Sequence, residues 1–195
     1  VEAATVTVND IPHTQIQLKE SDSPLNLTSG KVAGLVEARD RIFGGFLDKL
    51  NDFAATLAFE FNRVFASGQG LVGHQQLLSE NAAVSTTAPL DQSGLPFTPS
   101  NGSVQVLTRN LQTGVVKTTE IPVRLYGLTT DTTLESLAAD INAIDGLSAR
   151  ITPQRKLEIT SESANIDFSF AQDTSGALAA LGLNTFFTGS DAYSI

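Results

Sequence analysis

The chain has 195 residues, of which 41% are hydrophobic and 17% charged, a balance typical of globular proteins and unlike that of disordered chains. Its formal net charge of -9 disfavours nucleic acid and anionic membranes as partners, and no apolar run reaches the ~18 residues of a membrane span. The absence of cysteine excludes disulfide scaffolds, thiolate metal sites and cysteine nucleophiles.

Two short segments near the beginning of the chain alternate between apolar and polar residues. Residues 4–8 and 14–18 show this period of two on either side of residues 9–13, which include Pro12 and have turn composition. The pattern predicts a small β-hairpin. Ser29 then stands where it can cap a helix.

Residues 31–67 carry apolar side chains at intervals of mostly three, four or seven, which predicts one long amphipathic helix. Gly44 and Gly45 predict a kink or break within it, and the glycine-containing segment 68–70 predicts its end. The simplest interpretation of the apolar stripe is an intramolecular core. The alternative is that it packs against a partner helix from a part of the protein that lies outside this sequence.

The rest of the chain predicts a second, mixed domain. Residues 73–100 lose periodicity and are rich in proline, glycine and polar residues, as in a linker or irregular excursion. The predicted strands are 103–109, 115–125, 147–152, 156–161 and 165–170, and the predicted helices are 134–144 and 175–181.

These elements together predict an α+β fold. It consists of a β-hairpin and a long helix over residues 1–72, a linker or irregular excursion over 73–100, and a smaller α+β domain over 101–195. That outer domain has antiparallel strands and two short helices. Because the chain opens at Val1 and contains no methionine, we expect a piece of a longer protein.

No pattern in the sequence indicates catalysis or a metal site. His13 and His74 are the only histidines, and neither has acidic neighbours at ligand spacing. Residues 68–73 match G-x-G-x-x-G, but they follow a helix instead of a strand, so a helix end explains them better than a phosphate site. We therefore expect no enzyme activity, no cofactor and no bound metal, with both histidines in turns.

Three segments resemble parts of flagellar axial proteins. Residues 30–40, continued by 47–50, 57–62 and 66–73, resemble the central helix of the first hook-associated protein family of the bacterial flagellum. Residues 133–142 with 146–150 and 157–161 resemble the hook "IN" motif, which flagellins, filament caps and hook-associated proteins share. Residues 168–190 resemble the stretch before the C-terminal segment of the hook-associated family.

The residues that carry the resemblance are expected to be structural, with no catalytic role. Small glycines can allow close backbone approach, and the charged residues can pair or meet solvent. The motif positions are Gly30, Gly34, Leu35, Glu37, Arg39, Asp40, Phe61, Asn62, Ile141, Asn142, Gly182, Leu183, Asn184, Phe186 and Phe187.

The resemblance implies a central fragment of a secreted, extracellular subunit at the junction between hook and filament, with a role in motility and flagellum assembly. Its implied partners are the hook protein, the second junction hook-associated protein and copies of itself, while the isolated fragment is expected to be monomeric. Alternatives are another axial protein, such as flagellin or the filament cap, or a secreted adhesin or glycan-binding module.

Overall fold

The computed structural model describes residues 2–8, 11–21, 23–25, 28–70 and 72–188. The chain divides into two compact units, Val1–Leu50 and Asn51–Ile195, so that the division falls inside a helix. The domain boundaries expected at residues 72 and 100 follow from composition and stay predictions. The elements combine helices with antiparallel sheets, which confirms the α+β class.

The predicted hairpin is present in the first unit. Strand β1 (Glu2–Val8) pairs antiparallel with β2 (Ile11–Leu18), with Val8 opposite Ile11, and the short strand β3 (Ser23–Pro24) pairs with the far end of β2. His13 lies in β2 opposite Val6, so its predicted place in a turn is wrong. The ladder extends to residue 11, which leaves only residues 9–10 for the connection, and these lie outside the described residues.

The predicted long helix forms in three successive parts. Helix α1 (Gly30–Glu37) leads into the π-helical segment η1 (Ala38–Phe43), and α2 (Gly44–Ala66) follows. Helical hydrogen bonding therefore changes just before Gly44 and Gly45, and α2 runs through both glycines. Ser29 occupies the N-cap position, but its side chain makes no capping hydrogen bond.

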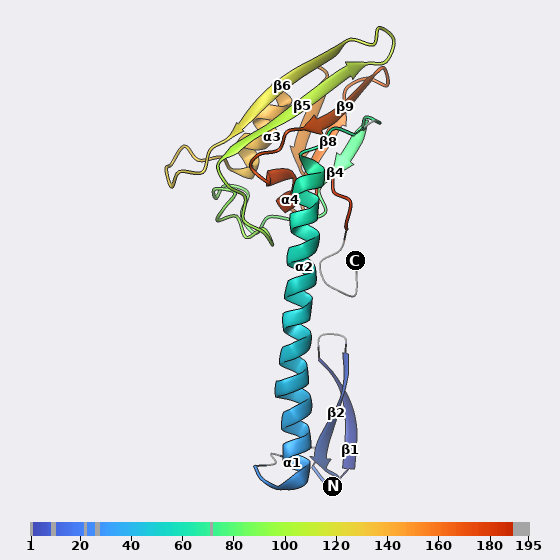
Figure 1. The fold of residues 1–195 in the computed structure, drawn as a ribbon, viewed down its shortest axis with the longest axis vertical. Helices are drawn as coiled ribbons and strands as arrows, with labels where there is room; N and C mark the ends of the chain where they lie inside the picture. Colours follow the sequence, from blue (N-terminus) through green and yellow to red (C-terminus); the bar gives the residue numbers. More distant parts are fainter. Residues whose placement is uncertain (1, 9–10, 22, 26–27, 71, 189–195) are drawn as a thin grey trace. The chain divides into compact units, whose positions relative to one another are not determined.

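The second unit contains two three-stranded antiparallel sheets (Figure 1). One has the order β6-β5-β9 and the other β4-β8-β7, so β5 and β8 are the central strands. The short strand β4 was not predicted and lies within the segment expected to be a linker. The strands are β4 (Gln76–Leu78), β5 (Gly102–Asn110), β6 (Val116–Val123), β7 (Leu147–Ile151), β8 (Leu157–Ser161) and β9 (Ile166–Ala171).

Helix α3 (Leu134–Asn142) joins the two sheets through the core, since it contacts β7, β6 and β8. A capping box starts it: the Thr133 hydroxyl accepts from the Ser136 N–H, and the Ser136 hydroxyl accepts from the Thr133 N–H. Helix α4 (Ala177–Leu181) is buried throughout. The largest core side chains include Phe168 and Phe170 on β9, whose rings meet edge to face.

The turn between β6 and α3 is held by one buried carboxylate. Asp131 accepts hydrogen bonds from the backbone N–H groups of Tyr126, Gly127 and Leu128 at 3.0, 2.6 and 3.0 Å. The bond from Tyr126, with those from Leu128 and Gly127, lowers the pKa of Asp131 below its ordinary value, although burial opposes this shift. The ionised carboxylate has only acceptors and can therefore bind all three N–H groups, whereas the protonated form carries an O–H donor on one of its oxygens.

This turn predicts a specific dependence of stability on pH. Because the pKa of Asp131 is lower in the folded state, its stabilising effect is present above the pKa of an unfolded aspartate, about 3.9, and is lost as pH falls through the lowered value. Asp131→Asn should therefore reduce the free energy of unfolding at pH 7, and the difference from wild type should shrink in acid. Denaturant unfolding between pH 7 and pH 2 measures this, and a constant difference would contradict it.

Candidate functional site

No metal centre is formed by the described residues, since none of their His, Asp and Glu side chains gather in groups of three or more. His74 forms an isolated antiparallel bridge to β9, in which its backbone exchanges hydrogen bonds with that of Phe168 at 2.7 and 2.9 Å. In the part of the chain that the structure describes, no helix is both long and apolar enough to span a membrane.

The glycine-rich segment after α2 opens no helix. Residues 68–70 follow the end of α2 at Ala66 without regular structure, as expected for a helix end. Gly73 instead permits a close approach, because a Cβ there would lie 2.4 Å from the carboxylate of Asp167. That carboxylate is buried and forms an ion pair with Arg109 across β5 and β9. Gly73 is therefore required because a side chain at this position would collide with the paired carboxylate.

The two residues of the IN motif have separate structural tasks in α3. Ile141 is buried in the core, whereas the Asn142 amide accepts from the Ala149 N–H at 2.7 Å and donates to the Ala149 carbonyl at 2.6 Å. The side chain thus makes the two hydrogen bonds that the backbone of a neighbouring strand would otherwise make to Ala149. Asn142 thus ties the end of α3 to the outer edge of β7.

Asn62 makes the corresponding arrangement on α2, and it joins two of the segments that carry the family resemblance. Its side-chain oxygen accepts from the N–H groups of Phe186 and Phe187 at 3.0 and 2.9 Å, and its amide donates to the Phe187 carbonyl at 2.8 Å. We call these three hydrogen bonds the Asn62 clasp. They connect positions up to 125 residues apart in the chain, which no local pattern in the sequence could predict.

An aromatic cluster surrounds the clasp. The ring of Phe61 lies 5.6 Å from that of Phe186 and 5.1 Å from that of Phe187, and Phe65 lies 5.7 Å from Phe186. Such separations and the tilted ring planes are those of favourable aromatic pairs. Four phenylalanines from two distant segments therefore meet at the end of α2, although Phe186 remains 61% exposed.

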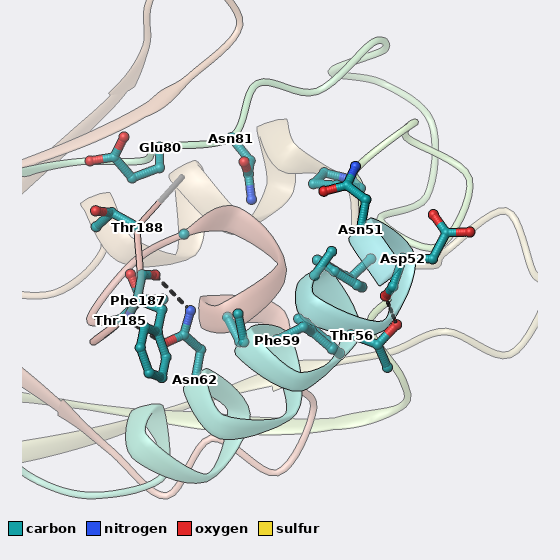
Figure 2. Close-up of a pocket in the computed structure, with 16 residues that line it drawn as sticks. Asn51, Asp52, Thr56, Phe59, Asn62, Glu80, Asn81, Thr185, Phe187 and Thr188 are labelled. Atoms are coloured by element: carbon teal, nitrogen blue, oxygen red, sulfur yellow. Dashed lines mark hydrogen bonds between the residues drawn. The ribbon is translucent and has the colours of Figure 1, made fainter. Parts of the chain in front are cut away.

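A groove of about 380 Å³ lies beside the clasp, between α2, the segment around Glu80 and the last described residues (Figure 2). Phe59 and Phe97 stack on one another at its wall, with ring centroids 4.0 Å apart. Phe187 is the third aromatic residue of the lining, and the other lining residues are small or polar; they include the carboxylates Asp52 and Glu80 but no lysine or arginine. The groove is an open, mildly acidic surface feature without a constellation of catalytic groups.

The other motif residues at the end of the second unit form a fixed turn. Gly182 closes α4 with a φ of +69°, Leu183 is buried, and Asn184 has a φ of +51°, which asparagine tolerates better than most residues. This turn leads directly from the core to the clasp.

In the first unit, the motif residues lie on a helix surface. Glu37 pairs with Arg41, and Arg39 pairs with Asp40, as charged residues on an exposed helix can. A Cβ added to Gly30 or Gly34 would meet nothing within 4 Å, so the close approach expected there is not made within the described residues. Leu35 is likewise exposed.

The apolar stripe of the long helix is exposed. In the second unit we define the stripe by Phe53, Leu57, Phe61, Val64 and Phe65, which lie three or four residues apart or adjacent along α2. The simplest interpretation placed these side chains in an intramolecular core, but Phe53 is 64% and Leu57 59% exposed. The core of the second unit forms between the sheets, α3 and α4, so only Asn62 and Ala66 of α2 are buried.

The comparison with family models matches this helical region. Residues 1–78 match the model described as "Flagellar hook-associated protein FlgK helical domain". Over these residues the chain is similar to the FlgK family. The match confirms the recognition drawn from residues 30–73, and with it a structural, hook-associated role in the flagellum. The resemblances of residues 133–161 and 168–190 lie outside the matched segment and stay predictions, and no curated protein matches the chain.

Proposed function

We propose that this chain is part of the junction between hook and filament, where it acts as an exported, extracellular and non-catalytic adaptor. The exposed apolar stripe of α2 carries the proposal. A surface-exposed row of large apolar side chains on one helix face marks a contact with another polypeptide segment, because the contact removes that area from water. The proposed partners are the hook protein, the second junction hook-associated protein and further copies of this subunit.

The proposal predicts that the stripe is needed for assembly and dispensable for the fold of the chain. In the full-length protein, Phe53→Ser with Leu57→Ser should abolish filament attachment and swimming in a strain that lacks the native gene. The matched control is Glu60→Ser on the same helix, an exposed residue whose ion pair with Arg63 contributes little. Swimming in soft agar and electron microscopy of hooks are the measurements.

The same substitutions in the 195-residue chain should shift the thermal midpoint by only about 1–2 °C, because the side chains are exposed. Normal filaments on cells with the serine variant would overturn the proposed role of the stripe. Hooks that lack filaments but still carry the variant subunit would favour a contact with the next protein of the junction.

A further inference from the structure

We propose that residues 184–188 form a detachable strap, which the Asn62 clasp holds against α2 and which can open while the rest of the second unit stays folded. The inference goes beyond the proposed function, because it concerns a conformational device within this unit.

The strap depends on Asn62 for its backbone hydrogen bonds. Residues 184–188 belong to no strand or helix, and among the described residues their backbone groups hydrogen-bond only to the Asn62 side chain. Asn62 is only 8% exposed, so the amide that serves the strap is itself removed from water. Substitution of this one side chain would leave two N–H donors and one carbonyl of the strap without a protein partner.

The core of the second unit ends where the strap begins. Leu183 is buried and its N–H donates to the Leu178 carbonyl at 2.8 Å, whereas Phe186 is exposed. The hydrophobic core includes Leu181 and Leu183 but none of the residues of the clasp. The strap can therefore leave α2 without opening the core, as expected for a local unit whose opening costs less than global unfolding.

Opening the strap would change the groove. Thr185, Phe187 and Thr188 line it on one side, opposite Phe59 of α2, as Figure 2 shows. The closed strap therefore forms one wall of the groove. An open strap would expose the Phe187 ring and the Asn62 amide.

Hydrogen exchange of the 195-residue chain, followed residue by residue by NMR, tests this proposal. Asn62→Ala should accelerate exchange at the amides of Phe186 and Phe187 by about ten- to a hundredfold and leave those of Phe168 and Phe170 unchanged. Asn62→Asp keeps the acceptor oxygen for both N–H groups but replaces the donor to the Phe187 carbonyl with a second carboxylate oxygen, so it should retain more of the protection of both amides than Asn62→Ala does.

Asn142→Ala is the matched control, because Asn142 makes the equivalent clasp to Ala149 elsewhere in the unit. It should accelerate exchange at Ala149 and leave the strap unchanged. Unchanged exchange at Phe186 and Phe187 in Asn62→Ala would overturn the proposal, as would equal acceleration in Asn62→Asp. Acceleration that spreads to Phe168 and Phe170 would also overturn it, since the strap would then unfold only with the core.

Discussion

Phe168→Ala should lower the free energy of unfolding of the second unit by about 3–5 kcal/mol, the range measured for removal of a buried aromatic side chain. Phe168 is fully buried on β9, its ring meets that of Phe170 edge to face, and its backbone joins both β5 and His74. The cavity would lie where the two sheets and α3 share one core, so its walls are set by several elements and can collapse only in part. Denaturant unfolding followed by circular dichroism measures the loss.

The matched control for this substitution is Phe186→Ala. Phe186 also makes ring contacts, but it lies 61% exposed at the surface, so its removal leaves no enclosed cavity. We expect a loss of about 1 kcal/mol or less for the control, consistent with a partly exposed aromatic pair. Equal losses for both variants would mean that the two rings are equally buried, against the structure.

Local sequence patterns predicted most of the regular elements correctly. The alternation in residues 4–8 and 14–18 predicted the first hairpin, and the helix predicted over residues 134–144 begins as α3 at Leu134, where Thr133 forms the capping box. These features depend on side-chain period and on capping chemistry within a few residues. Such information is present in the sequence itself, because the groups that interact are neighbours in the chain.

The features that the sequence did not predict depend on distant parts of the chain. The period of the α2 stripe shows that Phe53 and Leu57 share one face, but it does not show whether that face is covered within this chain. The Asn62 clasp requires Phe187 to arrive from 125 positions away, and β4 is a strand of three residues that pairs with β8. Only the tertiary arrangement supplies these partners, so periodicity and composition could not reveal them.

Gly182→Ala is the second substitution with a large expected effect, about 2–5 kcal/mol of lost stability. Two causes add: a left-handed backbone costs an L-residue about 1–2 kcal/mol, and forcing a methyl group into a filled space costs about 1–3 kcal/mol. Gly182 has a φ of +69°, and a Cβ built there would lie 2.6 Å from the Cβ of Glu80, closer than real Cβ atoms come to other heavy atoms.

The neighbouring segment cannot easily move away from this new methyl group. The Glu80 N–H points to the Gly182 carbonyl at 3.4 Å, and Asn81 binds α4 twice, through its N–H to the Leu181 carbonyl and its side-chain amide to the Ala180 carbonyl. Relief of the clash would therefore break hydrogen bonds that hold α4 in place. Since Gly182 also begins the turn that leads to the strap, the variant should loosen the clasp as well as the core.

Gly114→Ala separates the two causes. Gly114 has nearly the same backbone, with a φ of +70°, but a Cβ there would meet nothing within 4 Å in the loop between β5 and β6. The free energy of unfolding of this variant should therefore fall only by the cost of the left-handed backbone, about 1–2 kcal/mol. Denaturant unfolding of both variants gives the cost of the clash as the difference between them. If the two variants lost the same free energy of unfolding, the segment at Glu80 would have moved away from the new methyl group without cost. That result would contradict the rigid packing of Glu80 against Gly182 and the claim that this turn holds the strap in place next to Asn62.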